Sequence, residues 1–576
     1  MTLSVKPLCP IQGVEQAFGS YDELYSDFKW ALPESMNVAE MVCERHANGQ
    51  GRLALIAENE HGDCCRYSFD QISAGASRLA AVMLRAGVKR GDRVAVIMPQ
   101  RVETALLHIA AQRIGAVSLP LSILFGDDAL RYRLQDSGTC FLIVAHQRAE
   151  LIESLREVLP DLHTVLPVFE AGPVALNAEG FAEEELDSSL ENSFWQCMQT
   201  TEPHTETAEL KPDDPAFLLY TSGTTGPPKG ALVPQRALLG NLTGFECSHN
   251  GFSQTNDVVF TPADWAWTGG LLDALLPAWY YGTPVVALDY KKFNTQTVWS
   301  LMSRHRVTCA FIPPTALKII RAELDGIDKQ PLALRSIMSA GETVGEALFE
   351  WAQRVLKVPV NEMCGQTEHN YLMGNCSALM PVKPGSMGKA YPGHQVAIMG
   401  PNGELLPDGE TGEVVAHKDD PVHFLGYWNN PEATAKKYTG DWFHTGDVGH
   451  RDDDGYLWFH GRADDVISSA GYRIGPGEIE NCALSHEAVL QVAAIGVPDP
   501  EEIRGDVVKL CVVLRDGESA SDKLESSLQS HIREHLAAYE YPRLLEFYEH
   551  LPMTTTGKIQ RNVLRQWHQE KPTFND

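Results

Sequence analysis

One loop of the chain, residues 220–231, collects hydroxyl groups, glycines and a lysine between two apolar runs. It reads YTSGTTGPPKGA, and residues 215–219 and 231–234 predict short buried strands on either side. Glycines let backbone N–H groups approach a ligand closely, hydroxyls add donors and a lysine adds positive charge, which together suit a polyphosphate. The residues concerned are Thr221, Ser222, Gly223, Thr224, Thr225, Gly226 and Lys229. Gly230 follows the lysine, which excludes a Walker A loop, but the composition alone also fits a mobile hairpin turn.

A second polar segment, residues 361–368, reads NEMCGQTE and follows the apolar run 358–360. It predicts a polar turn that ends in Thr367 and Glu368. A hydroxyl and a carboxylate side by side can hold a divalent cation together with a phosphate oxygen, because Mg²⁺ prefers oxygen ligands of these kinds. Taken alone, this pair carries little specificity.

Three further segments carry isolated charged groups. Residues 442–447 read WFHTGD and residues 461–465 read GRADD, which supplies a carboxylate at a strand end and an arginine able to bind ribose hydroxyls or phosphate. A surface ion pair is the alternative interpretation of these two. Residues 551–561 read LPMTTTGKIQR and place Lys558 in a Thr/Gly loop, where a lysine is ordinarily solvated.

The five segments together, in this order across residues 67–561, resemble the adenylate-forming superfamily of acyl-CoA synthetases, luciferases and nonribosomal adenylation domains. Residues 469–476, SAGYRIGP, and 541–543, YPR, resemble its medium-chain acyl-CoA synthetase branch. The resemblance implies an ATP-dependent, Mg²⁺-requiring ligase. A small carboxylic acid and ATP would give acyl-AMP and pyrophosphate, and coenzyme A would then give acyl-CoA and AMP.

The resemblance also implies a role for each motif. Lys558 would be the catalytic lysine, Thr367 would meet the α-phosphate, and Glu368 would bind Mg²⁺. The loop at 221–226 with Lys229 would hold the β- and γ-phosphates, and Asp447 and Arg462 the ribose. Further nucleotide contacts are expected from Gly341, Glu342, Glu362, Met363, Cys364, Gly365 and Gln366, although Cys364 stands where many relatives have an aromatic residue that stacks on adenine. Asp464 would be a hinge, Gly471 would line a pantetheine tunnel, and CoA contacts are expected from Tyr472, Arg473, Arg504 and Tyr541.

The acid itself is predicted from residues 263–269, ADWAWTG, which resemble acetyl-CoA synthetases and place Trp265 and Trp267 at the acyl pocket. Those enzymes have a tryptophan cap at the position of Gly365. A pocket without this cap predicts butyrate or longer acids over acetate by about tenfold or more, because each buried methylene contributes roughly 0.8 kcal/mol. Met363 or Tyr371 filling the gap would restore a small pocket.

Charge and cysteine usage narrow the class of partner. Acidic residues outnumber basic ones by 76 to 47, for a net charge of −29, which disfavours nucleic acid and anionic membranes. No apolar run is long enough for a signal peptide or a membrane span, which predicts a cytoplasmic enzyme without membrane insertion. The 12 cysteines include no Cys-x-x-Cys pair and are expected to be reduced, mostly buried thiols.

Strands alternating with helices from residue 67 onward predict an α/β fold with parallel sheet covered by helices. Residues 172–213 are acidic and weakly periodic, and predict a solvated connection. A small β-rich subdomain is expected over 385–458, and an α+β pattern follows it. The predicted domains are 1–462, for nucleotide and acid binding, and 463–576, a mobile lid that carries the catalytic lysine.

Two other functions remain open on the same residues. An adenylating enzyme could load a separate carrier protein, although no fused carrier is visible after the lysine loop. A catalytically silent nucleotide-binding regulator is the other, and it conflicts with the intact charged residues of every motif. A CoA-dependent assay of pyrophosphate release separates the three.

Overall fold

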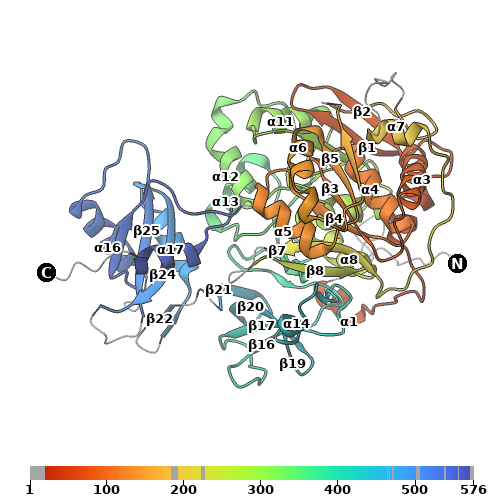
Figure 1. Ribbon diagram of the computed structural model, residues 1–576. Coiled ribbons are helices and arrows are strands. Elements are labelled where there is room, and N and C mark those ends of the chain that lie inside the picture. Colours follow the sequence, from red (N-terminus) through yellow and green to blue (C-terminus); the bar gives the residue numbers. More distant parts are fainter. Residues whose placement is uncertain are drawn as a thin grey trace. The chain divides into compact units, whose positions relative to one another are not determined.

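The computed structural model describes residues 20–170, 172–182, 193–221, 227–463, 465, 467–469, 472–500, 506–536, 540–554 and 557–570 (Figure 1). The chain forms two compact units. The first comprises residues 1–221, 228–395 and 418–436, and the second comprises residues 222–227, 396–417 and 437–576. Each unit is described by itself below.

The first unit contains a seven-stranded sheet in the order β18-β8-β7-β4-β3-β5-β6. Strands β7, β4, β3, β5 and β6 run parallel, whereas β7 and β8 form an antiparallel pair. Their bounds are β3 Arg93–Ile97, β4 Val117–Leu121, β5 Phe141–Ala145, β6 Thr164–Val168, β7 Pro215–Thr221, β8 Lys229–Pro234 and β18 Gly426–Tyr427. The associated helices are α3 Phe69–Arg85, α4 Val102–Arg113, α5 Asp127–Ser137 and α6 His146–Ser154, with a 3₁₀ turn Arg156–Val158. The predicted alternation of strands and helices is confirmed, as is the strand pair around the 220–231 loop.

A nine-stranded sheet completes the first unit, in the order β15-β14-β13-β12-β11-β9-β10-β1-β2. Its six central strands, β13 to β1 in this order, are parallel, and antiparallel strands close both edges. The bounds are β1 Leu53–Asn59, β2 Cys64–Ser68, β9 Val259–Phe260, β10 Val285–Asp289, β11 Cys309–Phe311, β12 Ser336–Ala340, β13 Val360–Gln366, β14 His369–Gly374 and β15 Lys389–Ala390. Apolar strand residues such as Val286 and Ile337 pack with Leu317 and Leu301 of the neighbouring helices in one buried cluster.

The remaining helices of this unit are shorter or irregular. They are α1 Tyr21–Asp27, α2 Val38–Val42, α7 Phe194–Gln199, α8 Ala237–Ser248, α9 Thr268–Gly270, α10 Leu276–Tyr280, α11 Thr295–Arg304, α12 Pro314–Glu323, α13 Glu346–Trp351 and α14 Pro431–Ala435. The π-helical turn Leu271–Leu275 joins α9 to α10, and another, Ala352–Leu356, extends α13. Single 3₁₀ turns occupy Glu44–His46 and Leu324–Gly326.

The expectation of a solvated connection over 172–213 is wrong for α7, Phe194–Gln199, whereas residues 202–209 are exposed or partly exposed as expected. Helix α7 buries Phe194, Trp195 and Met198 completely. The Trp195 indole also donates a hydrogen bond of 3.3 Å to the carboxylate of Glu103 on α4. These three residues form a local apolar cluster in a segment that is acidic on average, and burial of the cluster stabilises the helix.

The second unit combines a small sheet with an α+β body. The sheet runs β16-β17-β20-β19 with β21 paired to β20, over β16 Val396–Met399, β17 Gly412–His417, β19 Tyr438–Thr439, β20 Trp442–Arg451 and β21 Leu457–Arg462. The body contains β22 Ile467–Ser469, β23 Tyr472–Ile474, α15 Pro476–Leu484, β24 Val489–Pro498, β25 Asp506–Leu514, α16 Asp522–His535, β26 Leu544–Phe547 and α17 Arg561–Glu570. The α+β segment is thus confirmed. The β-rich subdomain expected over 385–458 is confirmed in part, because residues 385–395 and 418–436 belong to the first unit. The domain boundary at residue 462 falls inside this unit and stays a prediction.

Two chain-wide expectations concern thiols and membranes. The cysteines of the described residues are free thiols, and Cys64 is the exposed one among them. No helix in the described ranges is long and apolar enough to cross a membrane.

Candidate active site

The carboxyl ends of parallel strands in the nine-stranded sheet bring several predicted site segments to one edge. Strands β9, β11, β12 and β13 are parallel neighbours in the sheet, with Ala340 of β12 opposite Met363 of β13. Their carboxyl ends therefore lead into residues 261–267, 312–313, 341–342 and 367–368 respectively. In open α/β sheets ligands bind outside the carboxyl ends of the strands. The topology thus places the tryptophan segment, Gly341–Glu342 and the Thr367–Glu368 turn at a common edge.

The tryptophan segment is anchored by residues that follow strands of the other sheet. Ser122, directly after β4, donates a hydrogen bond of 2.7 Å to the carboxylate of Asp264. Gln100, which follows β3, donates to the carbonyls of Thr261 and Ala263 at 3.1 and 2.6 Å. Burial raises the pKa of Asp264, a tendency opposed by its hydrogen bonds. The carboxyl ends of both sheets therefore meet at this segment.

The two predicted acyl-pocket tryptophans differ in exposure. Trp265 is 1% exposed, and its indole nitrogen has no hydrogen-bond partner among the described residues. Trp267 is partly exposed and packs edge-on against Phe125 with ring centroids 5.6 Å apart. Trp267 is therefore the tryptophan whose ring retains solvent-accessible surface next to this edge.

Thr367 and Glu368 form the two-residue turn of a hairpin between β13 and β14, since Gln366 pairs with His369. The backbone N–H of Phe424 donates to the Glu368 carbonyl at 2.8 Å. Glu368 is 8% exposed, and no basic side chain among the described residues forms an ion pair with it. A buried carboxylate next to a hydroxyl, without a cationic partner from the protein, fits a Mg²⁺ ligand.

Gly365 sits at an irregular step in the pairing of β13 with β14. A Cβ at this position would lie 2.7 Å from the backbone nitrogen of Tyr371 and 3.1 Å from the carbonyl carbon of Asn370. The glycine is therefore required by the close approach of β14. A tryptophan here would have to displace the backbone of β14. Tyr371, the alternative filler of the pocket, is buried and donates a hydrogen bond of 3.0 Å to the Asp273 carbonyl.

Tyr427, which the sequence analysis did not single out, joins the two phosphate motifs. It lies on β18, which pairs with β8 opposite Ala231. Its hydroxyl donates a hydrogen bond of 2.5 Å to Oε1 of Glu368, and the Nζ atom of Lys229 lies 5.2 Å from the centre of its ring. The sequence around Tyr427 contains no motif that predicts a role in the site, because the residues that Tyr427 contacts are remote in sequence.

The base of the phosphate loop is well defined. Thr221 and Lys229 are paired across β7 and β8, and the Thr221 hydroxyl donates a hydrogen bond of 3.4 Å to the Lys229 carbonyl. Tyr132 donates to the carbonyl of Pro228 at 3.1 Å. Ser222, Gly223, Thr224, Thr225 and Gly226 lie outside the described residues, so the structure brings Thr221 and Lys229 together and leaves the loop's tip as a prediction.

Glu362 supports the loop after β12. Burial raises the pKa of its carboxyl to about 8, and a hydrogen bond from the backbone of Val344 works against that rise. Within that loop Gly341 has a φ of +96°, and Glu342 accepts a hydrogen bond of 3.1 Å from Thr315. Met363 is buried, while Cys364 and Gln366 are partly exposed at the end of β13.

Asp447 and Arg462, both in the second unit, are brought together by the pairing of β20 with β21. Arg462 donates to Oδ1 of Asp447 at 2.8 Å and to the carbonyl of Thr445 at 3.1 Å. The side chain of Asp447 is 13% exposed and that of Arg462 is 32% exposed. The carboxylate expected at a strand end lies instead within β20, and Arg462 ends β21; the pair is half-buried, which a loose surface ion pair would not be.

Lys558, in the same unit, is exposed on a tight turn. Its backbone nitrogen donates to the Thr554 hydroxyl at 3.0 Å, and its carbonyl accepts from the Thr554 nitrogen at 2.7 Å. Just beyond the turn, Arg561 donates to both carboxylate oxygens of Glu480 at 2.8 Å. The turn is thus tied to α15 while its lysine faces solvent.

Of the remaining predicted residues, Tyr541 is partly buried. Asp464, Gly471 and Arg504 lie outside the described residues, and nothing is described of the side chains of Tyr472 and Arg473. Asp465, next to the predicted hinge, is held by Arg565 of α17, and by Arg561 at 3.5 Å.

Comparison with known families decides the class. A model of the AMP-binding enzyme family matches residues 43–428, and a model of the AMP-binding enzyme C-terminal domain matches residues 478–558. The chain belongs to the AMP-binding enzyme family. It is 34% identical over 547 residues to the rat protein named acyl-coenzyme A synthetase ACSM4, mitochondrial, covering 93% of this chain and 91% of that one. It is also 30% identical to the acetyl-coenzyme A synthetase of Bacillus subtilis, over 99% and 98% of the two chains.

Solved structures agree with this assignment. An anthranilate CoA ligase in complex with anthranoyl-AMP superposes with a TM-score of 0.80 at 27% identity, covering 93% of this chain and 98% of the other. ATP-bound MatB from Rhodopseudomonas palustris gives 0.78 at 26% identity, over 93% and 99% of the chains. This AMP-binding enzyme is therefore an AMP-forming acid–CoA ligase, an acyl-CoA synthetase that uses ATP, Mg²⁺ and CoA.

Proposed function

We propose that this acyl-CoA synthetase acts on short-to-medium-chain carboxylic acids and prefers butyrate or longer acids to acetate. The observation that carries the proposal is the packing at Gly365: β14 approaches so closely that no tryptophan can stand there, so the cap expected in acetyl-CoA synthetases is missing. An uncapped apolar pocket gains roughly 0.8 kcal/mol for each buried methylene, so each added methylene favours the longer acid.

Catalytic efficiencies for acetate, butyrate and hexanoate, measured by pyrophosphate release, test this proposal. We expect the native enzyme to favour the longer acids by about tenfold or more. A native preference for acetate would refute the proposed acid class while leaving the ligase assignment intact.

Trp267 provides the matched variant, because its ring is partly exposed beside this edge. Trp267→Ala should alter the hexanoate-to-acetate ratio by about fivefold or more, equivalent to roughly 1 kcal/mol. Trp299→Phe is the control, since Trp299 lies on α11 and its indole donates to the Gln330 carbonyl at 2.8 Å. An equal effect of both variants on the ratio would remove Trp267 from the pocket.

For the first half-reaction we assign each charged residue according to the charge of ATP or of the acid that it can neutralise. The acid is already ionised near neutral pH, so its attack on the α-phosphate needs alignment and charge neutralisation but no general base. Lys229 and the 221–226 loop bind the β- and γ-phosphates, and Thr367 orients the α-phosphate. Glu368 would hold Mg²⁺, and the ion would supply positive charge beside the phosphate oxygens. Lys558 holds the carboxylate and bridging oxygens.

We assign separate residues to the ribose and to the base of the nucleoside. Asp447 accepts hydrogen bonds from the ribose hydroxyls, and Arg462, which already donates to Asp447, fixes its orientation. Gly341, Glu342 and residues 362–366 surround the base. Support for these assignments comes from the shared strand edge and from the half-buried Asp447–Arg462 pair.

The second half-reaction requires that the lysine turn leave the nucleotide so that the CoA thiol can attack the acyl-adenylate. We assign the pivot to Asp464 and the boundary between the two functional domains to residues 462–463. Gly471, Tyr472, Arg473, Arg504 and Tyr541 are assigned to CoA. Asp464→Pro fixes φ at about −65° and should therefore slow thioester formation while sparing adenylation. Unchanged turnover with CoA would place the pivot elsewhere.

We further propose that the enzyme works in the cytoplasm. Support comes from the free thiols of the described cysteines, which suit a reducing compartment. Cell fractionation with an antibody to the native protein tests this assignment.

A further inference from the structure

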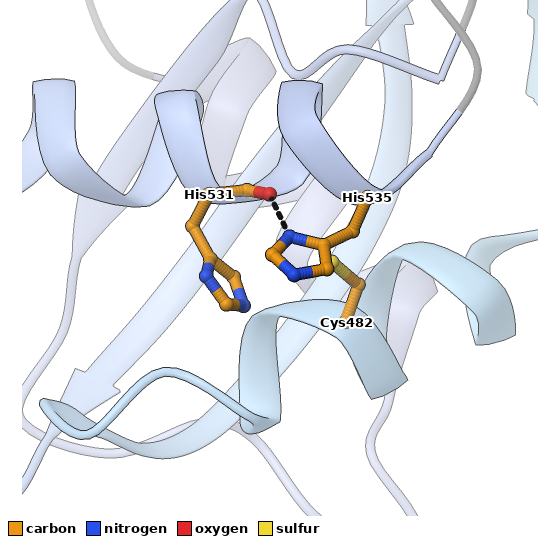
Figure 2. A group of neighbouring side chains, drawn as sticks. All are labelled: Cys482, His531 and His535. Carbon is orange, nitrogen blue, oxygen red and sulfur yellow. Dashed lines mark hydrogen bonds between the residues drawn. The ribbon is translucent and has the colours of Figure 1, made fainter.

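A group of metal-ligating side chains lies in the second unit between two helices that the catalytic assignment does not use. Cys482 is on α15, and His531 and His535 are on α16 (Figure 2). The two histidines are four residues apart and so occupy one face of the helix. One ligand atom from each of the three side chains lies within 4.8 Å of the others.

Hydrogen bonds fix the tautomer of each histidine. Nδ1 of His535 is 2.7 Å from the carbonyl of His531, so it carries the proton and donates (Figure 2). The hydroxyl of Ser485 donates to the Cys482 carbonyl at 2.6 Å and therefore accepts from Nε2 of His531 at 2.7 Å. These bonds leave the lone pairs on Nε2 of His535 and Nδ1 of His531 available. Metal-bound histidines characteristically donate their other ring N–H in this way.

A third histidine nearby is already satisfied. The ring of His486 lies 5.5 Å from that of His531. Its Nδ1 accepts a hydrogen bond of 3.3 Å from the backbone of Ala488, and its Nε2 donates to Ser527 at 3.2 Å. His486 therefore has no lone pair to offer and serves as a control.

A second group of potential ligands, Glu58, Cys64 and His305, differs in charge. Its carboxylate is already neutralised, because Arg304 and His305 both hydrogen-bond to Glu58, the latter at 2.6 Å. An arginine at that position repels a metal cation. This group supplies a matched thiol control.

We propose that Cys482, His531 and His535 form a binding site for a divalent transition-metal ion of the Zn²⁺ class. A thiolate with two imidazoles is a ligand set typical of zinc, with water in the fourth position. On binding, the Cys482 S–H bond breaks, a sulfur–metal bond forms, and the proton passes to solvent. The bound ion would cross-link α15 to α16, and α15 also carries Glu480, which anchors the catalytic lysine's turn through Arg561.

Titration of the full-length, metal-free protein with Co²⁺ tests the site, because cobalt reports tetrahedral geometry and thiolate ligation in its absorption spectrum. We expect one equivalent to bind with a sulfur-to-cobalt charge-transfer band, and Zn²⁺ to displace it. Cys482→Ser should abolish the band, and His535→Ala should remove the tetrahedral spectrum. Ser485→Ala removes only the hydroxyl that fixes the tautomer of His531, so it should weaken Co²⁺ binding by roughly 10-fold.

The controls are His486→Gln and Cys64→Ser, which should bind Co²⁺ as the native protein does. Circular dichroism and adenylation activity establish that each variant is folded. A charge-transfer band that survives in folded Cys482→Ser would overturn the proposal, as would a loss of binding in Cys64→Ser. Thermal unfolding gives a second readout, because Zn²⁺ should raise the melting temperature of the native protein and not of the His535→Ala variant.

Discussion

Removing the hydroxyl of Tyr427 should impair the use of Mg²⁺, because that hydroxyl is the described side-chain donor to Glu368. The bond is 2.5 Å long, both residues are 8% exposed, and the acceptor is a carboxylate. Hydrogen bonds to charged groups contribute about 1.5–3 kcal/mol, and the loss of a buried donor leaves the carboxylate oxygen without a partner. Tyr427→Phe should therefore cost about 2 kcal/mol, or roughly 30-fold in the rate of adenylation.

The assay is acid-dependent pyrophosphate release at increasing Mg²⁺ concentrations. The apparent Mg²⁺ affinity should fall together with the rate, since Glu368 loses the bond that orients it. Lys229 should be unaffected, because a phenylalanine keeps the ring that lies 5.2 Å from its ammonium. Tyr427→Leu removes the ring as well, and the lost cation–π contact should cost about 1 kcal/mol more, seen as weaker ATP binding.

Tyr67→Phe is the matched control, since Tyr67 is buried and its hydroxyl donates to the Val174 carbonyl at 2.8 Å. That variant loses a comparable hydrogen bond far along the chain from the motifs and should keep the native Mg²⁺ dependence. If Tyr427→Phe lowers thermal stability as Tyr67→Phe does but leaves the Mg²⁺ dependence unchanged, Tyr427 has no role in orienting Glu368.

Three other outcomes follow from the same site. Lys558→Ala should reduce adenylation by roughly 100-fold or more while a supplied acyl-adenylate still reacts with CoA, and equal losses in both half-reactions would contradict its assignment. Because the pKa of Glu362 is raised to about 8, folding of the native protein takes up a proton between pH 4.5 and about 8, and its stability falls as pH rises through that window. Glu362→Gln lacks this proton, so its stability relative to the native protein should rise across the window. Melting temperatures of the two proteins that run parallel with pH would refute this. Gly475→Ala places a Cβ 1.8 Å from the His460 carbonyl and so excludes this arrangement of α15 against β21. Rapid-quench measurement of Gly475→Ala should show one of the two half-reactions, adenylation or thioester formation, slowed and the other spared.

The parallel strands of the first unit could be predicted because burial on both faces leaves continuous apolar runs bounded by turns. The apolar run over residues 93–99 predicts a buried strand, and β3 occupies Arg93–Ile97. The apolar run over 258–262 predicts another strand, but β9 covers Val259–Phe260, because the carbonyls of Thr261 and Ala263 accept hydrogen bonds from Gln100. The apolar pattern therefore identifies a strand, whereas the residue at which the strand ends depends on a contact with a remote residue, here Gln100.

Side-chain partners between remote segments account for most of what could not be predicted. The Glu368–Tyr427 and Ser122–Asp264 bonds join residues 59 and 142 positions apart, and neither pair shares a periodic element. The motif at 361–368 indicated which carboxylate matters, but its donor depends on β18 pairing with β8. The histidine pair His531 and His535 has a spacing that metal sites use, but the third ligand, Cys482, is remote in sequence and joins them only because α15 packs beside α16.

The basic side chains of the motifs fall into two groups that explain how a chain with a net charge of −29 can receive two anions. Among the described residues, Lys229 faces an aromatic ring and Lys558 faces solvent, and neither is neutralised by a carboxylate. Arg561, only three positions after Lys558, is clamped by Glu480 and Asp465. An ion pair with a protein carboxylate would have to be broken before a phosphate could bind, at a cost that grows with burial. Keeping the two lysines unpaired avoids that cost, whereas pairing the arginine fixes the turn from which Lys558 projects.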